Sequence, residues 1–294
     1  MSIQYGSLYV DEKYKASILP NLFYKTWIMP GITCQDATSD NNGSWFWHKL
    51  TSTGAPAVKL PGQDFTDEAA ADTLVQCTYN NNFQRSKKIY GVQAASVAFP
   101  VAEEHLALAT NEVSEGKNLS GLACLIQEGT ASTDTAAITA ANLVEKVVAE
   151  RKAIVKAKGT ANVMLCSPDF FATMLEAAGS KYLPTTNEKI IAAAGGGQVG
   201  EYLGMLWIEV NGFANTSNIE YYDYTSTKRT ITAANLALVD FIMYDSAALG
   251  IGDNFNIARI VDSELFAGSK AQVEDNVAFR VLQNTVVRVK KHAA

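Results

Sequence analysis

The stretch from Asn162 to Asn211 constrains the fold of this chain more than any other part of the sequence. It begins with a short apolar segment, Val163 to Cys166, which is followed at once by Ser167 and Pro168. Serine is a favoured helix N-cap, and proline suits the first helical turn, because the N–H group that it lacks would have no partner there. The stretch therefore predicts a strand that passes directly into a helix.

The predicted helix has one apolar face and a defined end. Its apolar residues repeat with helical spacing, at Phe170, Phe171, Met174, Leu175 and Ala178. Gly179 is expected to end it, and a second strand, Met205 to Val210, follows Gly204. The stretch therefore predicts the order strand, helix, excursion and strand.

A second helix is predicted from about Pro100 to Glu115. Glu103 and Glu104 lie early in this segment, where carboxylates suit the positive end of the helix dipole. Gly116 is expected to stop the helix, and the residues from Lys117 to Leu122 are expected to form a turn.

A third helix is predicted from Thr139 to Lys158, with Thr139 as N-cap and Gly159 as the stop. Its branched apolar residues are expected to form one buried stripe, made of Val144, Val147, Val148, Ile154 and Val155. Cationic residues gather toward its C-terminal end, as the helix dipole favours.

Strands are predicted on both sides of these helices. Ser44 to Leu50 and Leu74 to Tyr79 favour strands joined by a tip too long for an ordinary hairpin turn, which is best explained if the tip contacts a partner. Leu236 to Tyr244 favours a buried strand, and the last 40 residues alternate as in an antiparallel sheet. Residues 1 to about 40 are rich in aromatic groups, which must lie against either their own domain or a neighbouring subunit.

The composition favours assembly and disfavours strong nucleic-acid binding. Only 18% of the residues are charged, below the roughly 25% of ordinary soluble domains, and 48% are hydrophobic. The net charge of −6 is opposite to the clustered positive charge that phosphate binding needs. The C-terminal cations, including Arg288 and Lys290, alternate with valines, so they are interpreted as the solvated face of a strand.

No pattern indicates catalysis, a metal or a cofactor. The three histidines, His48, His105 and His292, are far apart in sequence with no carboxylate or cysteine at ligand spacing. The four cysteines are also widely spaced and are expected to be small buried hydrophobes. The run from Gly195 to Glu201 lacks the lysine and hydroxyl residue of a phosphate-binding loop. We therefore expect no enzyme activity, and no signal peptide or membrane segment is recognisable.

Three segments carry a resemblance to a known family: N-L-S-G-L at Asn118, V-M-L-C-S-P-D-F-F-A-T-M-L at Val163 and V-D-F-I-M-Y-D-S at Val239. With the order of elements, they resemble the major capsid proteins of tailed bacteriophages, a fold also used by encapsulins. The resemblance implies an α+β fold with five segments: an N-terminal arm at 1–42, an extended loop hairpin at 43–82, a peripheral domain with a spine helix at 83–135, an axial domain at 136–252 and peripheral return strands at 253–294.

The resemblance also implies a function and partners. The chain would self-assemble, as hexamers and pentamers of itself, into the icosahedral or prolate head shell of a virion formed in the host cytoplasm. It would enclose DNA without sequence-specific binding and would contact a portal protein and in some cases a decoration protein. Because the arm begins almost at Met1, a separate scaffolding protein is expected. One alternative is an encapsulin-type shell around a cargo enzyme, and the other is a soluble enzyme that forms a small oligomer and has an unrecognised site. The expected intersubunit contacts are aromatic: Tyr9, Tyr14, Phe23, Trp27, Trp45, Trp47 and Phe65.

Overall fold

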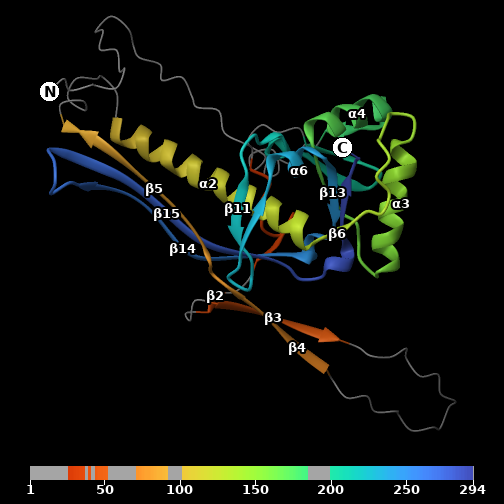
Figure 1. Cartoon of the computed structure of the whole chain (residues 1–294), viewed down its shortest axis with the longest axis horizontal. Coiled ribbons are helices and arrows are strands. Elements are labelled where there is room, and N and C mark those ends of the chain that lie inside the picture. Colours follow the sequence, from red (N-terminus) through yellow and green to blue (C-terminus); the bar gives the residue numbers. More distant parts are fainter. Residues whose placement is uncertain are drawn as a thin grey trace, which may run out of the picture.

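The computed structural model describes most of the chain: residues 26–36, 39–40, 44–51, 71–91, 101–184 and 199–293. Two large sheets, a long helix and a projecting hairpin organise these residues (Figure 1). The helices are α2 (Val101–Glu128), α3 (Leu143–Lys156), α4 (Pro168–Ala178) and α6 (Ala233–Ala237), with short 3₁₀ turns η1 (Gly179–Lys181), η2 (Asn211–Ala214), η3 (Ser246–Ala248) and η4 (Asn284–Val286). This mixture confirms the α+β prediction.

A seven-stranded sheet lies beside α3 and α4. Its strands, in spatial order, are β6 (Thr130–Ala131), β16 (Val287–Lys291), β13 (Val239–Tyr244), β7 (Val163–Cys166), β10 (Met205–Glu209), β9 (Val199–Tyr202) and β8 (Leu183–Pro184). β7 pairs with β10 in parallel and with β13 antiparallel. Being central, β7 is buried along its whole length, which explains its continuous apolar sequence.

The passage from β7 into α4 forms as predicted. The Ser167 hydroxyl accepts a hydrogen bond from the Phe170 N–H at 3.3 Å, and Pro168 opens the helix. Gly179 caps the other end with a φ of 51°, in the left-handed region that glycine tolerates. Phe170, Phe171, Met174 and Ala178 are all buried, so the predicted apolar face is the face that packs on the sheet.

A second, four-stranded sheet carries the longest strands. It consists of β1 (Gln35–Asp36), β14 (Leu249–Asp262), β15 (Gly268–Val281) and β5 (Asn81–Tyr90), in that order. β14 and β15 form a long antiparallel hairpin with a bulge between Asp253 and Phe255. Figure 1 shows this hairpin and β5 running beside α2, away from the seven-stranded sheet.

Two smaller sheets complete the described part of the chain. β11 (Ile219–Tyr222) pairs with β12 (Lys228–Ile231), and β2 (Ser39–Asp40), β3 (Ser44–Thr51) and β4 (Ala71–Thr78) form a three-stranded sheet. The pairing of β3 with β4 confirms the predicted strands of the extended hairpin.

The prediction that Gly116 ends the second helix is wrong. α2 continues through Gly116 and through the expected turn to Glu128. Gly116 permits close contact, because a Cβ there would lie 3.1 Å from the Phe83 ring. Gly121 has the same role toward Trp27, whose ring would lie 3.4 Å from an added Cβ. At both positions the absence of a side chain makes room for a ring from a distant part of the sequence. The two glycines therefore serve close packing inside the helix and do not end it.

The third helix is shorter than predicted, and a different face of it is buried. It begins at Leu143 with Asn142 as N-cap, so Thr139 is not the cap. Leu143, Val147 and Ile154 are buried, whereas Val144, Val148 and Val155 are 41–57% exposed. The buried stripe runs through Leu143, Val147 and Ile154, so it is rotated around the helix relative to the predicted stripe.

This rotation predicts different effects for adjacent valines. Val147→Ala should reduce the free energy of unfolding by about 2 kcal/mol, because it removes buried methyl groups from a packed core. Val148→Ala should change it by less than about 0.5 kcal/mol, as is usual for surface positions. Urea denaturation of the two variants measures both values, and equal losses would contradict the observed register.

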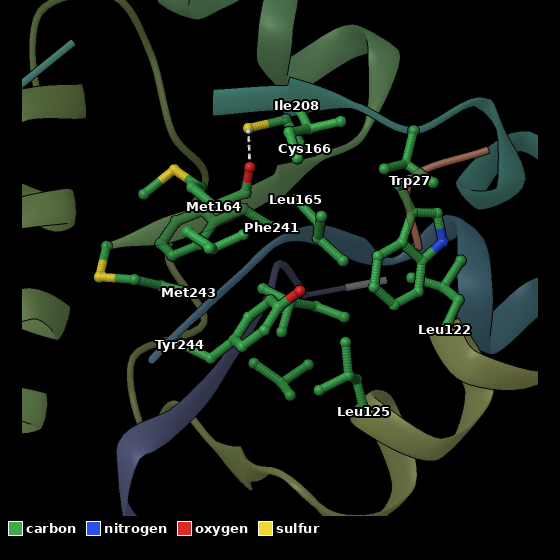
Figure 2. Close-up of a cluster of buried hydrophobic side chains, with 14 of the residues drawn as sticks. Trp27, Leu122, Leu125, Met164, Leu165, Cys166, Ile208, Phe241, Met243 and Tyr244 are labelled. Atoms are coloured by element: carbon green, nitrogen blue, oxygen red, sulfur yellow. Dashed lines mark hydrogen bonds between the residues drawn. The ribbon is translucent and has the colours of Figure 1, made fainter. Parts of the chain in front are cut away.

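One continuous core joins the seven-stranded sheet to α2. Figure 2 shows Leu122 and Leu125 of α2 facing Trp27, Leu165 and Tyr244. All four cysteines are buried and free, as predicted. Within the described ranges, no helix combines the length and the apolar composition that crossing a lipid bilayer requires.

The last strand departs from one prediction. β16 pairs with β13 in the seven-stranded sheet. Its cations are not a solvated face, because Lys290 is 1% exposed and contacts Asp134, and Arg288 contacts Glu150. The five segment boundaries stay predictions.

Candidate intersubunit interface

The most prominent projection of the described chain is the β3–β4 hairpin. Figure 1 shows both strands leaving the body of the molecule. Their antiparallel register runs from the pair Ser44 and Thr78 at the base to the pair Thr51 and Ala71. Trp45 and Cys77 are buried near its base, whereas Leu74 is 53% exposed, and a projecting element of this kind is suited to contact a neighbouring molecule.

Two tryptophans attach the base of this hairpin to β14. Trp45 is completely buried, and Trp47 is partly buried beside it. A Cβ added at Gly252 would overlap the Trp45 ring, and one added at Gly250 would overlap the Trp47 ring. The two glycines thus leave the space on the strand surface that the indoles occupy. Cys77, Tyr79 and Ala278 pack around Trp45 and complete a small core at the base.

Polar contacts attach the start of β5, which directly follows the hairpin, to the β11–β12 hairpin. The Asn81 side chain both donates to the Tyr222 carbonyl, at 2.9 Å, and accepts from the Tyr222 N–H, at 2.8 Å. The Arg280 guanidinium lies over the Tyr224 ring, 3.9 Å from its centroid, and donates to the Gln76 carbonyl of β4. The projecting hairpin is therefore held by two separate elements of its own chain.

The turn between β11 and β12 is organised by Asp223. Its carboxylate accepts hydrogen bonds from the Thr225 and Thr227 N–H groups, at 2.9 and 3.0 Å, and from the Arg229 Nε at 2.8 Å. Burial raises the pKa of this carboxyl group, but the hydrogen bonds from Thr225 and Arg229 outweigh burial and lower it to about 2.

This lowered pKa predicts a specific loss of stability in acid. Because the pKa in the folded state lies below the ordinary value, the stabilisation is complete above about pH 4 and is lost as the pH falls toward 2. Asp223→Asn should be less stable than the parent by about 1–2 kcal/mol at pH 7. Urea denaturation at several pH values should show this difference shrinking between pH 4 and pH 2. A difference that stays constant across that range would contradict the assignment.

The predicted contact residues fall into three groups. Tyr9, Tyr14, Phe23 and Phe65 lie outside the described residues. Trp27 and Trp45 are 1% and 0% exposed, so within this chain they pack in its core, and their contact with a neighbour stays a prediction. Trp47 keeps part of its surface exposed, and its contact with a neighbour stays a prediction.

The structure also identifies residues that the sequence interpretation missed. Gly250 and Gly252 alternate with apolar residues in L-G-I-G, and this pattern could have indicated a strand whose one face is reserved for large rings. Arg280 and Asp223 carry no such signal, since their partners belong to elements far away in the sequence.

The contacts described above are hydrophobic packing, hydrogen bonds and ion pairs. Among them, no group of three histidine, cysteine or acidic residues is placed to hold a metal ion. Burial raises the pKa of the Cys34 and Cys77 thiols to about 12, which makes them poor nucleophiles. His292 contacts Asp240 at 2.8 Å, a pair that joins the C-terminus to β13.

Comparison with solved structures places this geometry among known folds. No known family model matches the sequence, and no curated protein matches it either. The capsid structure of the cyanophage P-SCSP1u is similar over 96% of this chain and 92% of its own, with a TM-score of 0.68 and 12% identity. The chain has a phage capsid fold.

Two further solved structures support the same fold assignment. The asymmetric unit of the bacteriophage PhiM1 mature capsid covers 96% of this chain and 91% of its own, with a TM-score of 0.65 and 13% identity. A structure from Mycobacterium phage Che8 covers 97% of both chains, with a TM-score of 0.62 and 15% identity. Both similarities extend over nearly the whole length of this chain.

Proposed function

We propose that the chain is a major capsid protein that self-assembles into the head shell of a tailed phage. The observation that carries this proposal is the nearly full-length similarity to phage capsid structures, at TM-scores of 0.60–0.68. A fold alone supports several functions. Here the similarity extends over nearly the whole chain, and the projecting hairpin of this chain is suited to contacts with neighbours.

Two properties of the chain are consistent with a shell subunit. Low charge content suits a protein that covers much of its surface in contacts, and the projecting β3–β4 hairpin provides reach toward a neighbour. The net charge of −6 suits a wall that surrounds DNA without adhering to it. The structural role also accounts for a sequence with no catalytic pattern.

The partners follow from this role. Copies of the chain would form hexamers and pentamers, with a separate scaffolding protein during assembly and a portal protein at one vertex. A decoration protein would bind the outer surface of the finished shell. Head-to-tail contacts that close into rings build such assemblies from many modest interfaces.

The experiment is to express the chain alone and together with the products of neighbouring genes, and to measure particle size by analytical ultracentrifugation. Shell-sized particles, or rings of five or six subunits, are expected. The contents then separate the two kinds of shell, since phage particles should package DNA and an encapsulin-type shell should contain a cargo protein. A single monomer or dimer under every condition would contradict the proposal.

A further inference from the structure

The connection between β14 and β15 presents one exposed leucine. It runs from Ser263 to Ala267 at the far end of the long hairpin. The Ser263 N–H donates to the Gly268 carbonyl at 2.9 Å, and the Ser263 hydroxyl accepts from the Leu265 N–H at 3.3 Å. These bonds order the tip, yet Leu265 is 86% exposed. The exposure of Leu265 is thus built into an ordered turn.

The aromatic residue beside it does not cover Leu265. Phe266 packs against Tyr90 of β5, with ring centroids 5.1 Å apart, and the Lys270 ammonium lies 5.9 Å from the Phe266 centroid. The adjacent Asp262 and Glu264 are both exposed. The tip therefore presents one large apolar side chain flanked by two carboxylates.

The same sheet carries a cavity on the face opposite α2. Val273 marks the helix side, because it packs against Ala109 and Val113 of α2. Successive residues of a strand point to opposite faces, so Gln272 and Glu274 point away from the helix. The cavity has a volume of about 300 Å³ and lies over these residues, and its lining includes an apolar residue, Ile257.

The strand register defines the surface around this cavity. Ser86, Gln272 and Arg259 lie side by side across β5, β15 and β14. In the next row toward the tip, Lys88 pairs with Lys270. Arg259 and Lys88 thus place two cations on this face near one carboxylate, that of Glu274, whereas the Lys270 ammonium lies at the Phe266 ring of the tip.

The tip and the cavity face carry opposite charges. The tip has two carboxylates and an exposed leucine, and the face has an excess of cations around a cavity with an apolar wall. In its own chain Leu265 stays exposed, so it does not fill this cavity. A second copy of the chain would supply both surfaces in complementary form.

We propose that the β14–β15 tip of one subunit docks on the sheet of a neighbouring copy, with Leu265 in the cavity over Gln272 and Glu264 facing Arg259. This contact joins two different surfaces, so it is heterologous and repeats around a closed ring or along a lattice. It rests on the proposed function and specifies which residues of neighbouring subunits meet.

Disulfide crosslinking tests the contact directly. The double variant Leu265→Cys with Ser86→Cys should form intermolecular disulfides under mild oxidation and give covalent oligomers on a non-reducing gel. The native cysteines are buried and do not compete. The control pairs Leu265→Cys with Ser180→Cys, which is exposed on η1 and lies far from the cavity. It should give at least tenfold less crosslinked chain.

Charge reversal provides an independent readout of the same contact. Glu264→Lys and Arg259→Glu should each reduce the fraction of chains in particles at least tenfold, and their combination should restore most of it. Leu265→Met should assemble, whereas Leu265→Asp should not. Normal assembly of Leu265→Asp, or equal crosslinking of the control pair, would overturn the contact.

The two proposals fail in different ways. If the unmodified chain forms no particle under any condition, the proposed function is contradicted. Crosslinking is also measured on concentrated purified chain, and absence of the 265–86 disulfide there overturns the tip contact by itself. If particles form and the disulfide does not, the proposed function stands and only the tip contact is wrong.

Discussion

Replacing Gly252 with valine is expected to detach the base of the projecting hairpin and to lower the free energy of unfolding by about 3 kcal/mol. A Cβ at this position would overlap the Trp45 ring. Trp45 has no room to move, because it is fully buried among Cys77, Tyr79 and Ala278. The added side chain must therefore displace either the indole or the strand that carries it.

The measurement is urea denaturation together with limited proteolysis of β3 and β4. Asn256→Val is the matched control, because it places the same side chain at an exposed position of the same strand. It should change stability by less than about 0.5 kcal/mol. Combining Gly252→Val with Trp45→Leu should cost less than the sum of the two single changes, since the smaller side chain removes the obstacle. A loss no greater than that of the control would contradict the packing of Trp45 on Gly252.

The second large effect is expected where the C-terminal strand joins α3. The Arg288 Nε lies 2.8 Å from the Glu150 Oε2, and the two side chains are only 16% and 10% exposed. The Ser132 hydroxyl donates to the other Glu150 oxygen. Glu150→Ala should reduce the free energy of unfolding by about 3 kcal/mol, because it leaves a largely buried guanidinium without its partner.

An exposed ion pair of similar geometry provides the control. Lys228 and Glu220 are 2.7 Å apart, but both side chains are more than half exposed. Glu220→Ala should therefore cost less than about 1 kcal/mol. The double change Glu150→Leu with Arg288→Met should recover most of the loss, because an apolar pair leaves no buried charge. Chemical denaturation measures all three variants, and equal losses for Glu150→Ala and Glu220→Ala would contradict the account.

Sequence reasoning succeeded where the signal was local. Ser167, Pro168 and Gly179 define the ends of α4 through contacts within a few residues. The alternation in β15 likewise reflects one sheet face against α2 and the other face open. Elements of this kind follow from the period of apolar residues and from the chemistry of caps.

The rest was decided by contacts between distant segments. A glycine often ends a helix, so the sequence around Gly116 and Gly121 favours a stop there. The positions of Phe83 and Trp27 explain why α2 instead continues through both glycines. Lys290 alternates with valines, as an exposed lysine of a strand would. Its side chain is nevertheless buried, and its ammonium group contacts Asp134. In both cases the local pattern is compatible with two structures, and tertiary packing selects one of them.

The candidate interface shows the same limit. The sequence indicates that its tryptophans need a surface to cover them, but it does not tell whether that surface belongs to the same chain. Trp45 is covered by its own β14, where Gly252 leaves space. The sequence does not single out Leu265, because one leucine in a polar loop has no periodicity. Its exposure on an ordered tip is visible only in the structure.

The most direct test of a shell-forming subunit is electron microscopy of the purified protein, alone and co-expressed with neighbouring gene products. The account predicts closed shells, into whose density the described fold fits as one repeating subunit, with β3–β4 lying across a neighbouring copy. Particles limited to monomers or dimers under every condition, or shells in which this hairpin contacts no other subunit, would contradict it.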